Sequence, residues 1–172
     1  MNVMQVIMAR RSVRHFKPDP IPREVITTLL EAARHAPSAG NLQPWRFYAV
    51  WRDEVRSALA GAALGQLFIA QAPVVIVASA VPEDSGSKYG QRGRELYCLQ
   101  DTGAAVQNIL LAATAQGLGT CWVGAFDEGA VSRVLKLPPK ERPVAIIPVG
   151  YAAREARATS RKALAEISSF LE

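Results

Sequence analysis

The sequence predicts a domain in which helices and strands alternate along the chain, a mixed α/β or α+β fold. Two observations support this prediction. The 172 residues contain 49% apolar and 20% charged side chains, which is the composition of an ordinary globular protein. Apolar residues recur at helical spacing in some segments and form short alternating or β-branched runs in others. The length corresponds to one domain, which we expect to cover residues 1–172.

Apolar spacing and proline positions define the elements of the N-terminal half. Pro22 suits the first turn of a helix, and Pro37 stops the helix that follows it. Gly61 and Gly65 interrupt a later helical pattern. The predicted elements are helices over residues 2–9, 22–35 and 53–71 and a strand over residues 46–51.

The C-terminal half contains the most apolar segments of the chain. Residues 74–80 are apolar and β-branched, which indicates a buried strand. Pro82, Gly86 and Gly90 lie among polar residues and favour a loop or mobile lid over residues 81–92. A long helix over residues 94–116 is small or apolar nearly all round and should be buried, in a core or between subunits. The remaining predictions are strands over residues 119–124 and 143–150 and helices over residues 127–135 and 160–170.

Several classes of protein are disfavoured by what the sequence lacks. Cys98 and Cys121 lack metal-binding spacing and are interpreted as reduced thiols. His15 and His35 offer no metal site based on histidine. Neither a secretory signal nor a run of about 18 apolar residues is present, so we expect a cytoplasmic protein that is not inserted in a membrane.

The positive charge is concentrated in two short segments. The net charge is +5, and the excess lies in residues 1–17 and 154–162. Such clusters can meet at one phosphate, which arginine binds through a bidentate fork, or they can be two separate solvated faces. A nucleic-acid binder would instead be expected to carry a basic stripe, and we expect no nucleic-acid partner. The cations of the two segments are Arg10, Arg11, Arg14, Lys17, Arg154, Arg157, Arg161 and Lys162.

Three motifs carry groups that can bind a ligand. RRSVRHF, residues 10–16, can present several donors to one anion, although it can also be a solvated turn. APSAGNLQPW, residues 36–45, is a stiff loop of neutral donors and acceptors that suits a heterocycle, with an Asx-type turn as the alternative. GLGTCWVGAF, residues 117–126, lacks the third glycine of a dinucleotide-binding loop, but Gly124 and Ala125 permit close approach to the backbone.

Taken in order, these segments resemble the FMN-dependent nitroreductase family. The likeness covers nearly the whole chain and includes RRSVRHF, APSAGNLQPW, APVVIVA, DTGAAVQNILLAATAQGLGT, WVGAFD and PVGY, followed by a basic pair. The resemblance implies an α+β fold with a mixed four- or five-stranded sheet flanked by helices. It also implies an intertwined homodimer with FMN at the interface. The chain is short for this family, and its brief lid region implies an open pocket with loose substrate choice.

The resemblance also implies roles for individual residues. Those that would bind the phosphate and ribityl chain are Arg10, Arg11, Ser12 and Arg14, with Arg161 and Lys162 completing the phosphate site. Arg14 would also lie near the pyrimidine edge of the flavin, to which Gln66 is a further possible donor. The residues that would come from the partner subunit are Pro37, Ser38, Ala39 and Asn41, with Gln43 bracing their loop. The backbone of Val123, Gly124 and Ala125 would present an N–H to flavin N5. Asp101 would be structural, and Trp122 would be either core or pocket wall.

The implied activity is reduction of nitroaromatics, quinones or similar flat electron-poor acceptors by NADH or NADPH in a ping-pong cycle. No side chain needs to act as a nucleophile, because the flavin carries the chemistry. Two alternatives stay open. The protein can be a flavin-binding redox sensor or storage module with little turnover, or it can have a specialised family activity such as dehalogenation.

Overall fold

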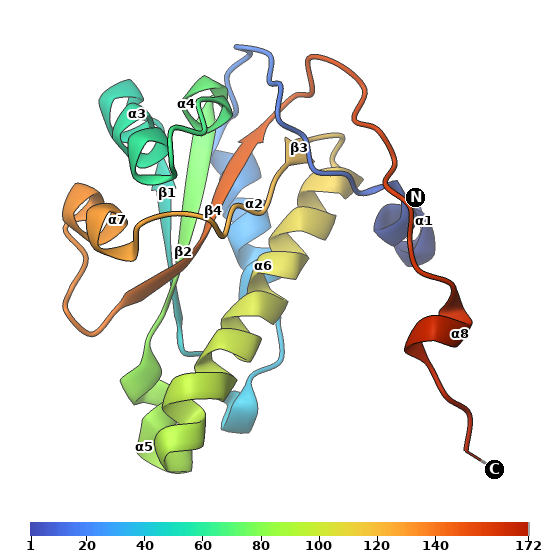
Figure 1. Cartoon of the computed structure of the whole chain (residues 1–172). Helices are drawn as coiled ribbons and strands as arrows, with labels where there is room; N and C mark the ends of the chain where they lie inside the picture. The colour runs from blue at the N-terminus through green and yellow to red at the C-terminus, as the bar shows by residue number, and fades with distance from the viewer. Residues whose placement is uncertain (172) are drawn as a thin grey trace.

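A four-stranded antiparallel sheet forms the centre of the molecule (Figure 1). The computed structural model describes residues 1–171. The sheet order is β1-β2-β4-β3, and every pair of named strands is antiparallel. The mixed sheet expected from the resemblance is therefore corrected, and parallel pairing among the described residues is confined to an isolated bridge between Ser12 and Thr120. The strands are β1 (Trp45–Val50), β2 (Val74–Ala80), β3 (Gly119–Thr120) and β4 (Arg142–Gly150).

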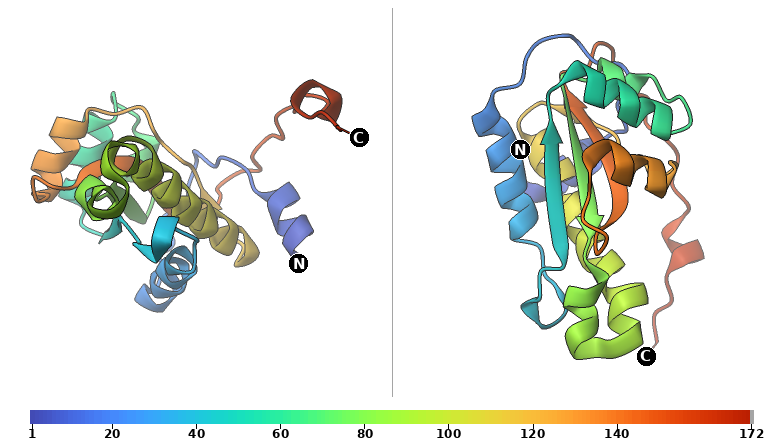
Figure 2. Two further views of the ribbon diagram at one scale, coloured as in Figure 1. Left: turned by 90° about the horizontal axis from the view of Figure 1, so that it is seen from below. Right: turned by 90° about the vertical axis from the view of Figure 1, so that its left-hand side faces the viewer.

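Helices cover both faces of this sheet, as the side view in Figure 2 shows. Alternate residues of a strand point to opposite faces, so β2 contributes to two apolar clusters. Val74 and Ile76 pack in the cluster under α2 and α6, whereas Val75 and Val77 pack in the cluster under α3, α4 and α7. The helices of these two layers are α2 (Arg23–Arg34), α3 (Asp53–Ala62), α4 (Phe68–Gln71), α6 (Cys98–Ala115) and α7 (Glu128–Leu135).

Most elements agree with the sequence prediction within a few residues. Helix α2 follows Pro22 and buries Ile26, Leu29 and Ala33 at helical spacing. The predicted helix over residues 53–71 is divided into α3 and α4 near the two glycines, as expected. These agreements arise because apolar spacing and proline act locally.

The segment over residues 81–92 is a helix, so the predicted loop is wrong. Helix α5 (Pro82–Arg92) has Pro82 in its first turn and only Gly90 in the left-handed region, with φ of 56°. It is followed by a π-helical turn, η2 (Gly93–Tyr97). A Cβ on Gly93 would lie 2.4 Å from the Ser85 carbonyl oxygen, so this glycine permits close packing of α5 on η2.

Two other predicted elements are shorter than expected. The strand over residues 119–124 is reduced to β3 and an isolated bridge between Val123 and Ile146. The helix over residues 160–170 is reduced to α8 (Leu164–Ile167). Leu164 and Ile167 are 66% and 65% exposed and α8 buries no residue in the described chain, so little tertiary packing supports a longer helix here.

Both ends of the chain project from the sheet and its helices (Figure 2). Helix α1 (Val3–Ala9) buries Val6 but leaves its other apolar side chains exposed. The C-terminal segment, residues 151–171, leaves the body beside the N-terminal segment and continues into α8. Within residues 1–171, no helix combines the length and apolarity that crossing a bilayer needs.

Candidate functional site

The basic N-terminal motif is held against the third motif and against the C-terminal segment. The N–H of Val13 donates to the Thr120 carbonyl over 2.8 Å. The N–H of Lys17 donates to the Tyr151 carbonyl over 2.8 Å, and the N–H of Ala153 donates to the His15 carbonyl over 2.9 Å. These backbone bonds bring the beginning and the end of the chain side by side.

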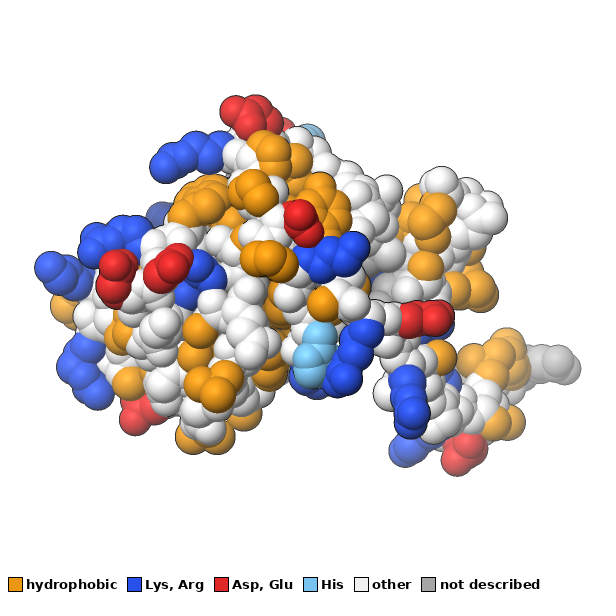
Figure 3. Space-filling model, turned by 90° about the horizontal axis from the view of Figure 1, so that it is seen from above, with side chains coloured by type: hydrophobic (Ala, Val, Ile, Leu, Met, Phe, Trp, Pro, Cys, Tyr) orange, Lys and Arg blue, Asp and Glu red, His pale blue; other side chains and the backbone are white. Residues whose placement is uncertain are grey.

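A basic cleft lies where these two segments meet. We call it the arginine cleft. It comprises a cavity of about 570 Å³ and a smaller one of about 70 Å³, which share Ser12, Arg14, Arg157 and Thr159. Glu155 is the only carboxylate among its lining residues. Figure 3 shows Lys and Arg side chains gathered beside a histidine in this part of the molecule. The other lining residues are Arg10, Arg11, Val13, His15, Arg154, Ala156 and Arg161.

Several guanidinium groups of the cleft are available to an anion. Among residues 1–171, Arg10, Arg14 and Arg157 form no ion pair with a carboxylate. The Arg14 guanidinium lies 5.9 Å from the centroid of the Phe68 ring, a cation–π contact that holds it in place. The Arg11 guanidinium is partly used within the chain, because its Nη1 donates to the carbonyl of Arg10 over 2.9 Å at the end of α1.

Burial keeps the one thiol near the cleft in its neutral form. Burial raises the pKa of Cys121, although the nearby Arg14 guanidinium opposes this shift. The Cys121 side chain is 2% exposed. A buried protonated thiol is a poor nucleophile, and Cys121 forms no disulfide with Cys98.

The segment at residues 122–126 presents backbone groups to an open space. Val123 exchanges hydrogen bonds of 2.9 and 3.0 Å with Ile146, which fixes the segment on β4. A Cβ on Gly124 would meet no atom within 4 Å. Among the described residues, neither the N–H of Gly124 nor that of Ala125 donates a hydrogen bond. Two unused backbone donors therefore lie in an exposed segment, with open space beside Gly124.

Gln66 braces this segment from the α3–α4 connection. Its Nε2 donates to the Ala125 carbonyl over 3.1 Å and to the Ala63 carbonyl over 2.9 Å. The amide hydrogens are thus used within the chain, and Oε1 is left as an acceptor.

A second cavity, of about 290 Å³, adjoins Gly124 on the side of α6. Trp122 and Phe126 form part of its wall, and the Arg142–Glu128 ion pair, at 2.9 Å, lies at its edge. Trp122 is 41% exposed, so of its two sequence interpretations the structure supports pocket wall over core. The remaining lining residues are Leu99, Gly103, Pro143 and Val144.

The loop of the second motif, residues 36–45, is a turn at the N-terminal end of α6, the end that lies away from the arginine cleft. Ser38 Oγ accepts from the N–H of Gln43 over 3.0 Å, and the N–H of Ala39 donates to Asp101 Oδ2 over 3.2 Å. Asn41 has φ of 55°, which asparagine tolerates better than most residues. The loop contains the 3₁₀ turn η1 (Ala39–Asn41). Asp101 has the structural role expected of it, and burial raises the pKa of its carboxyl despite the bond from Ala39.

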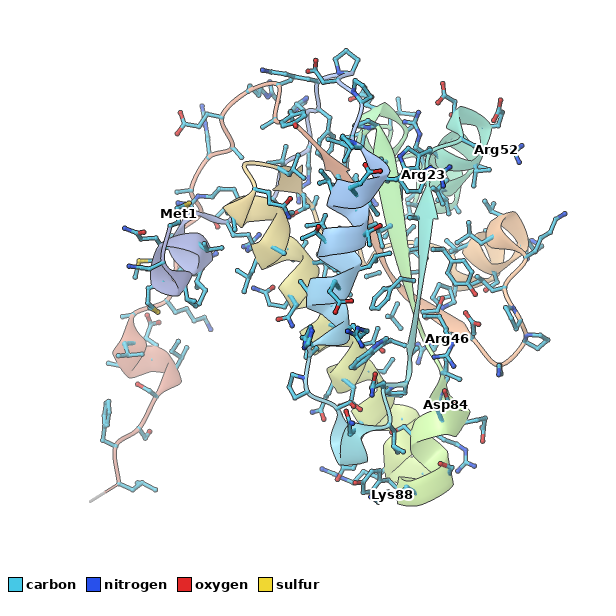
Figure 4. All side chains as sticks on the ribbon, turned by 180° about the vertical axis from the view of Figure 1, so that it is seen from behind. Met1, Arg23, Arg46, Arg52, Asp84 and Lys88 are labelled. Carbon is cyan, nitrogen blue, oxygen red and sulfur yellow. The ribbon has the colours of Figure 1, made fainter. Side chains whose placement is uncertain are left out.

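One chain does not bring all the predicted site residues together. Helix α6 has 18 residues and is about 27 Å long. Its N-terminal end contacts the 37–43 loop through Asp101, and its C-terminal end leads to β3 beside the arginine cleft. Figures 1 and 4 show the two regions at opposite ends of the molecule. Pro37, Ser38, Ala39 and Asn41 therefore lie far from the cleft of their own chain.

Sequence reasoning placed most of the cleft residues but not all of them. Arg10, Arg11, Ser12, Arg14 and Arg161 line it, whereas Lys162 is absent from its lining. Arg157 and Thr159 line both cavities of the cleft and were not assigned a site role. Arg157 belongs to the basic C-terminal segment, so the charge pattern pointed to it, but Thr159 carried no signal.

Comparison with known proteins finds one family over most of the chain. The sequence profile of the nitroreductase family matches residues 7–70 and 62–151. A protein of Thermus thermophilus named NADH dehydrogenase is 32% identical over 187 residues, covering 93% of this chain and 91% of that protein. The 5,6-dimethylbenzimidazole synthase of Rhodobacter capsulatus is 32% identical, covering 78% and 76%. The crystal structure of a nitroreductase family protein from Streptococcus pneumoniae superposes with a TM-score of 0.91 at 25% identity, covering 99% and 100%.

Proposed function

Since this chain belongs to the nitroreductase family, we propose that it is an FMN-dependent enzyme that passes electrons from NADH or NADPH to small, flat, electron-poor acceptors. Its oxidoreductase character follows from the family. The cofactor, the electron donor and the acceptors are the proposal. The whole chain, residues 1–172, would act as one flavin-binding domain.

The arginine cleft is the observation on which the proposal depends. A flavin mononucleotide ends in a dianionic phosphate, and guanidinium groups bind phosphate oxygens through charge-assisted hydrogen bonds. Arg10, Arg14 and Arg157 face the cleft without carboxylate partners. Thr159 and Ser12 supply hydroxyl groups beside them. This donor set fits a phosphate and the polyol next to it. Arg161 would complete the phosphate site, with Lys162 at its margin.

The backbone at Gly124 and Ala125 fits the ring of the same cofactor. Their unused N–H groups border open space, as a donor to a ring nitrogen requires. When bound, FMN supplies hydride acceptance at N5 and its return to an acceptor. Gln66 would hold the Ala125 carbonyl and so orient this backbone. Because its amide hydrogens are used within the chain, it would meet the pyrimidine edge as an acceptor through Oε1 and not as the expected donor. Arg14 would stabilise negative charge at that edge.

A second copy of the chain would complete the site. The loop that contains Ser38 and Asn41 lies at the wrong end of α6 to reach the cleft of its own chain. A homodimer would place this loop on the flavin of the partner. The exposed apolar side chains of the two chain ends fit the same arrangement, because a monomer leaves them in water. They are Met1, Val3, Met4, Ile7, Met8, Leu164, Ile167, Phe170 and Leu171.

The protein would bind and orient the cofactor and its two substrates and would exclude water from them. It needs no nucleophile. Donor and acceptor would use the same open face in turn, which gives a ping-pong cycle. The cavity beside Gly124, with Trp122 and Phe126 in its wall, offers apolar surface to a flat molecule. Nitroaromatics and quinones have this shape.

Spectroscopy of the purified protein tests the proposal. A band near about 450 nm, released by heat as free FMN, is expected. Under anaerobic conditions, NADH or NADPH should bleach the band at least as fast as the enzyme turns over. A nitroaromatic or quinone should then restore the band. A colourless protein that binds no added FMN would contradict the assignment. Bleaching without reoxidation by any acceptor would favour the redox-sensor alternative.

A double substitution tests the cleft directly. Arg10→Ala with Arg14→Ala should weaken FMN binding tenfold or more, because each charge-assisted bond contributes about 1.5–3 kcal/mol. The exposed pair Arg52→Ala and Lys140→Ala removes the same charge elsewhere and should leave the FMN dissociation constant unchanged. Equal affinities in the two double variants would refute the phosphate site.

A further inference from the structure

The α5–η2 hairpin presents two tyrosines, each with a cation against its ring. The rings of Tyr89 and Tyr97 meet edge to face, with centroids 5.3 Å apart and planes at 77°. The Arg92 guanidinium lies 5.3 Å from the Tyr97 ring, and its Nε donates to the Tyr97 hydroxyl over 2.9 Å. Lys88 Nζ lies 5.5 Å from the Tyr89 ring. We call these four residues the tyrosine–cation cluster.

This cluster packs directly on the loop that would reach the partner's flavin. A Cβ on Gly40 would lie 2.8 Å from the Tyr89 hydroxyl and 2.9 Å from Lys88 Nζ. The loop therefore approaches the cluster as closely as a glycine allows. Figure 4 shows Lys88 at the end of the molecule where α5 and the η1 turn lie together. Lys88 and Tyr89 therefore border the loop at Gly40, and Arg92 and Tyr97 join them through the contact between the two tyrosine rings.

The two cations of the cluster are compensated only in part by their surroundings. The neighbouring carboxylates are engaged, because Glu83 pairs with Arg94 at 2.9 Å and Asp84 pairs with Arg46 at 3.3 Å. Glu95 accepts from the neutral amide Nε2 of Gln91 over 2.8 Å and keeps its negative charge. Among residues 1–171, neither Lys88 nor Arg92 forms an ion pair, and both are exposed. An anion that enters here meets two cations that are not paired with a carboxylate of the described chain, and Glu95 is the one acid of the hairpin that no cation neutralises.

We propose that the tyrosine–cation cluster selects aromatic electron acceptors that carry an anionic group, such as a nitroaromatic carboxylate. Lys88 and Arg92 bind the carboxylate, and the tyrosine rings contact the aromatic ring. This inference rests on the proposed function, because it presumes a flavin beside the partner's 37–43 loop. It goes further by naming the charge of the preferred acceptor and the residues that set the preference.

The acceptor half of the cycle isolates this preference from any effect on NADH or NADPH, which are themselves anionic. FMN-loaded enzyme is reduced with dithionite and mixed anaerobically with 4-nitrobenzoate or with neutral 4-nitrobenzyl alcohol. The rate constant for reappearance of the oxidised flavin band is measured for each. In the wild type, the constant for 4-nitrobenzoate should be the larger one and should fall as salt is added, because salt screens exposed charges.

Charge removal in the cluster should affect only the anionic acceptor. The double variant Lys88→Gln/Arg92→Gln should lower the constant for 4-nitrobenzoate at least tenfold and change that for the alcohol less than twofold. Lys88→Arg/Arg92→Lys should restore most of the loss. The matched variant Arg52→Gln/Lys140→Gln, which removes the same charge from exposed positions elsewhere, should behave like the wild type.

The outcomes separate this inference from the proposed function. Equal losses with both acceptors, or no loss with 4-nitrobenzoate, would overturn the inference and leave the flavoenzyme assignment intact. A wild-type protein that fails to bind FMN, or whose reduced form neither acceptor reoxidises, would instead refute the proposed function. FMN occupancy of each variant is recorded first, so that a folding defect is recognised before rates are compared.

Discussion

The backbone N–H of Ala39 donates a hydrogen bond to Asp101 Oδ2 over 3.2 Å, across 62 positions of sequence. This bond fixes the 37–43 loop on α6. Burial raises the pKa of Asp101, so the folded protein holds a proton that the unfolded chain releases more readily. The stability contributed by this proton is fully present below the unfolded pKa and is lost as pH rises through the folded pKa.

We therefore expect Asp101→Asn to gain stability relative to the wild type as pH rises through the acidic range. Each unit of pKa elevation corresponds to about 1.4 kcal/mol. Urea unfolding of both proteins between pH 3 and pH 7 measures the difference, and Asp19→Asn, at an exposed position, is the matched control. If the difference in the free energy of unfolding between Asp101→Asn and the wild type does not change with pH, the Asp101 carboxyl does not contribute to the pH dependence of stability.

Arg157 lines both cavities of the arginine cleft and forms no ion pair in the described chain. Arg157→Ala should raise the FMN dissociation constant about tenfold or more, since a charge-assisted bond contributes about 1.5–3 kcal/mol. Fluorescence titration of the apoprotein measures this change. Arg133→Ala, on the exposed side of α7, should leave it unaltered. Identical titrations for the two variants would place the phosphate elsewhere.

Gly124 is the position where a single methyl group should separate ligand binding from folding. A Cβ there meets no atom within 4 Å, so Gly124→Ala should leave the melting temperature near that of the wild type. The methyl group would occupy the space proposed for the flavin ring and should weaken FMN binding about tenfold, an estimate based on a lost backbone contact. Unaltered FMN affinity would argue against a ring at this place.

Gly61 provides the control for glycine replacement. It is exposed within α3 and also meets no atom within 4 Å. Gly61→Ala should raise the free energy of unfolding by about 0.5–1 kcal/mol, because alanine favours the helix, and should not change FMN binding.

The exposed apolar face of α1 should be needed for association. Met4 and Ile7 are 57% and 45% exposed. Met4→Asp/Ile7→Asp should shift the mass measured by light scattering from twice 18.6 kDa toward 18.6 kDa, and FMN occupancy should fall with it. Arg52→Asp is the control for an added carboxylate. A wild-type protein that is monomeric at all concentrations, yet full of FMN, would contradict a site shared by two chains.

The sequence indicated local structure well where apolar spacing decides it. Helix α2 agrees with the prediction because its core positions recur at helical period, whereas β2 and α6 were indicated by continuous runs of apolar or small residues. Helix α5 was missed since Pro82 and the glycines were interpreted as breakers. Proline is compatible with a first helical turn, and Gly93 serves close packing that no local pattern reveals.

The candidate site was predictable only in part. Charge clustering pointed to both walls of the arginine cleft, because arginine is distinctive in sequence. It did not establish that residues 10–14 and 157–161 share a cavity, which depends on the backbone bonds at Val13, Lys17 and Ala153. Tyr89 lay in the segment that was predicted to be a loop and Tyr97 in the predicted helix over residues 94–116, so the packing of Tyr89 against Gly40 had no signal.

The length of α6 has a genetic consequence. If each flavin is held by the cleft of one chain and the loop of the other, a cleft defect in one chain and a loop defect in its partner fall on the same site of a mixed dimer and leave the other site intact. Co-expression of a cleft-defective chain, Arg10→Ala/Arg14→Ala, with a chain defective in Ser38 and Asn41 should yield hybrids that retain one sound pocket, although neither parent retains any. Complementation of this kind would show, without a crystal structure, that each flavin site takes residues from both subunits.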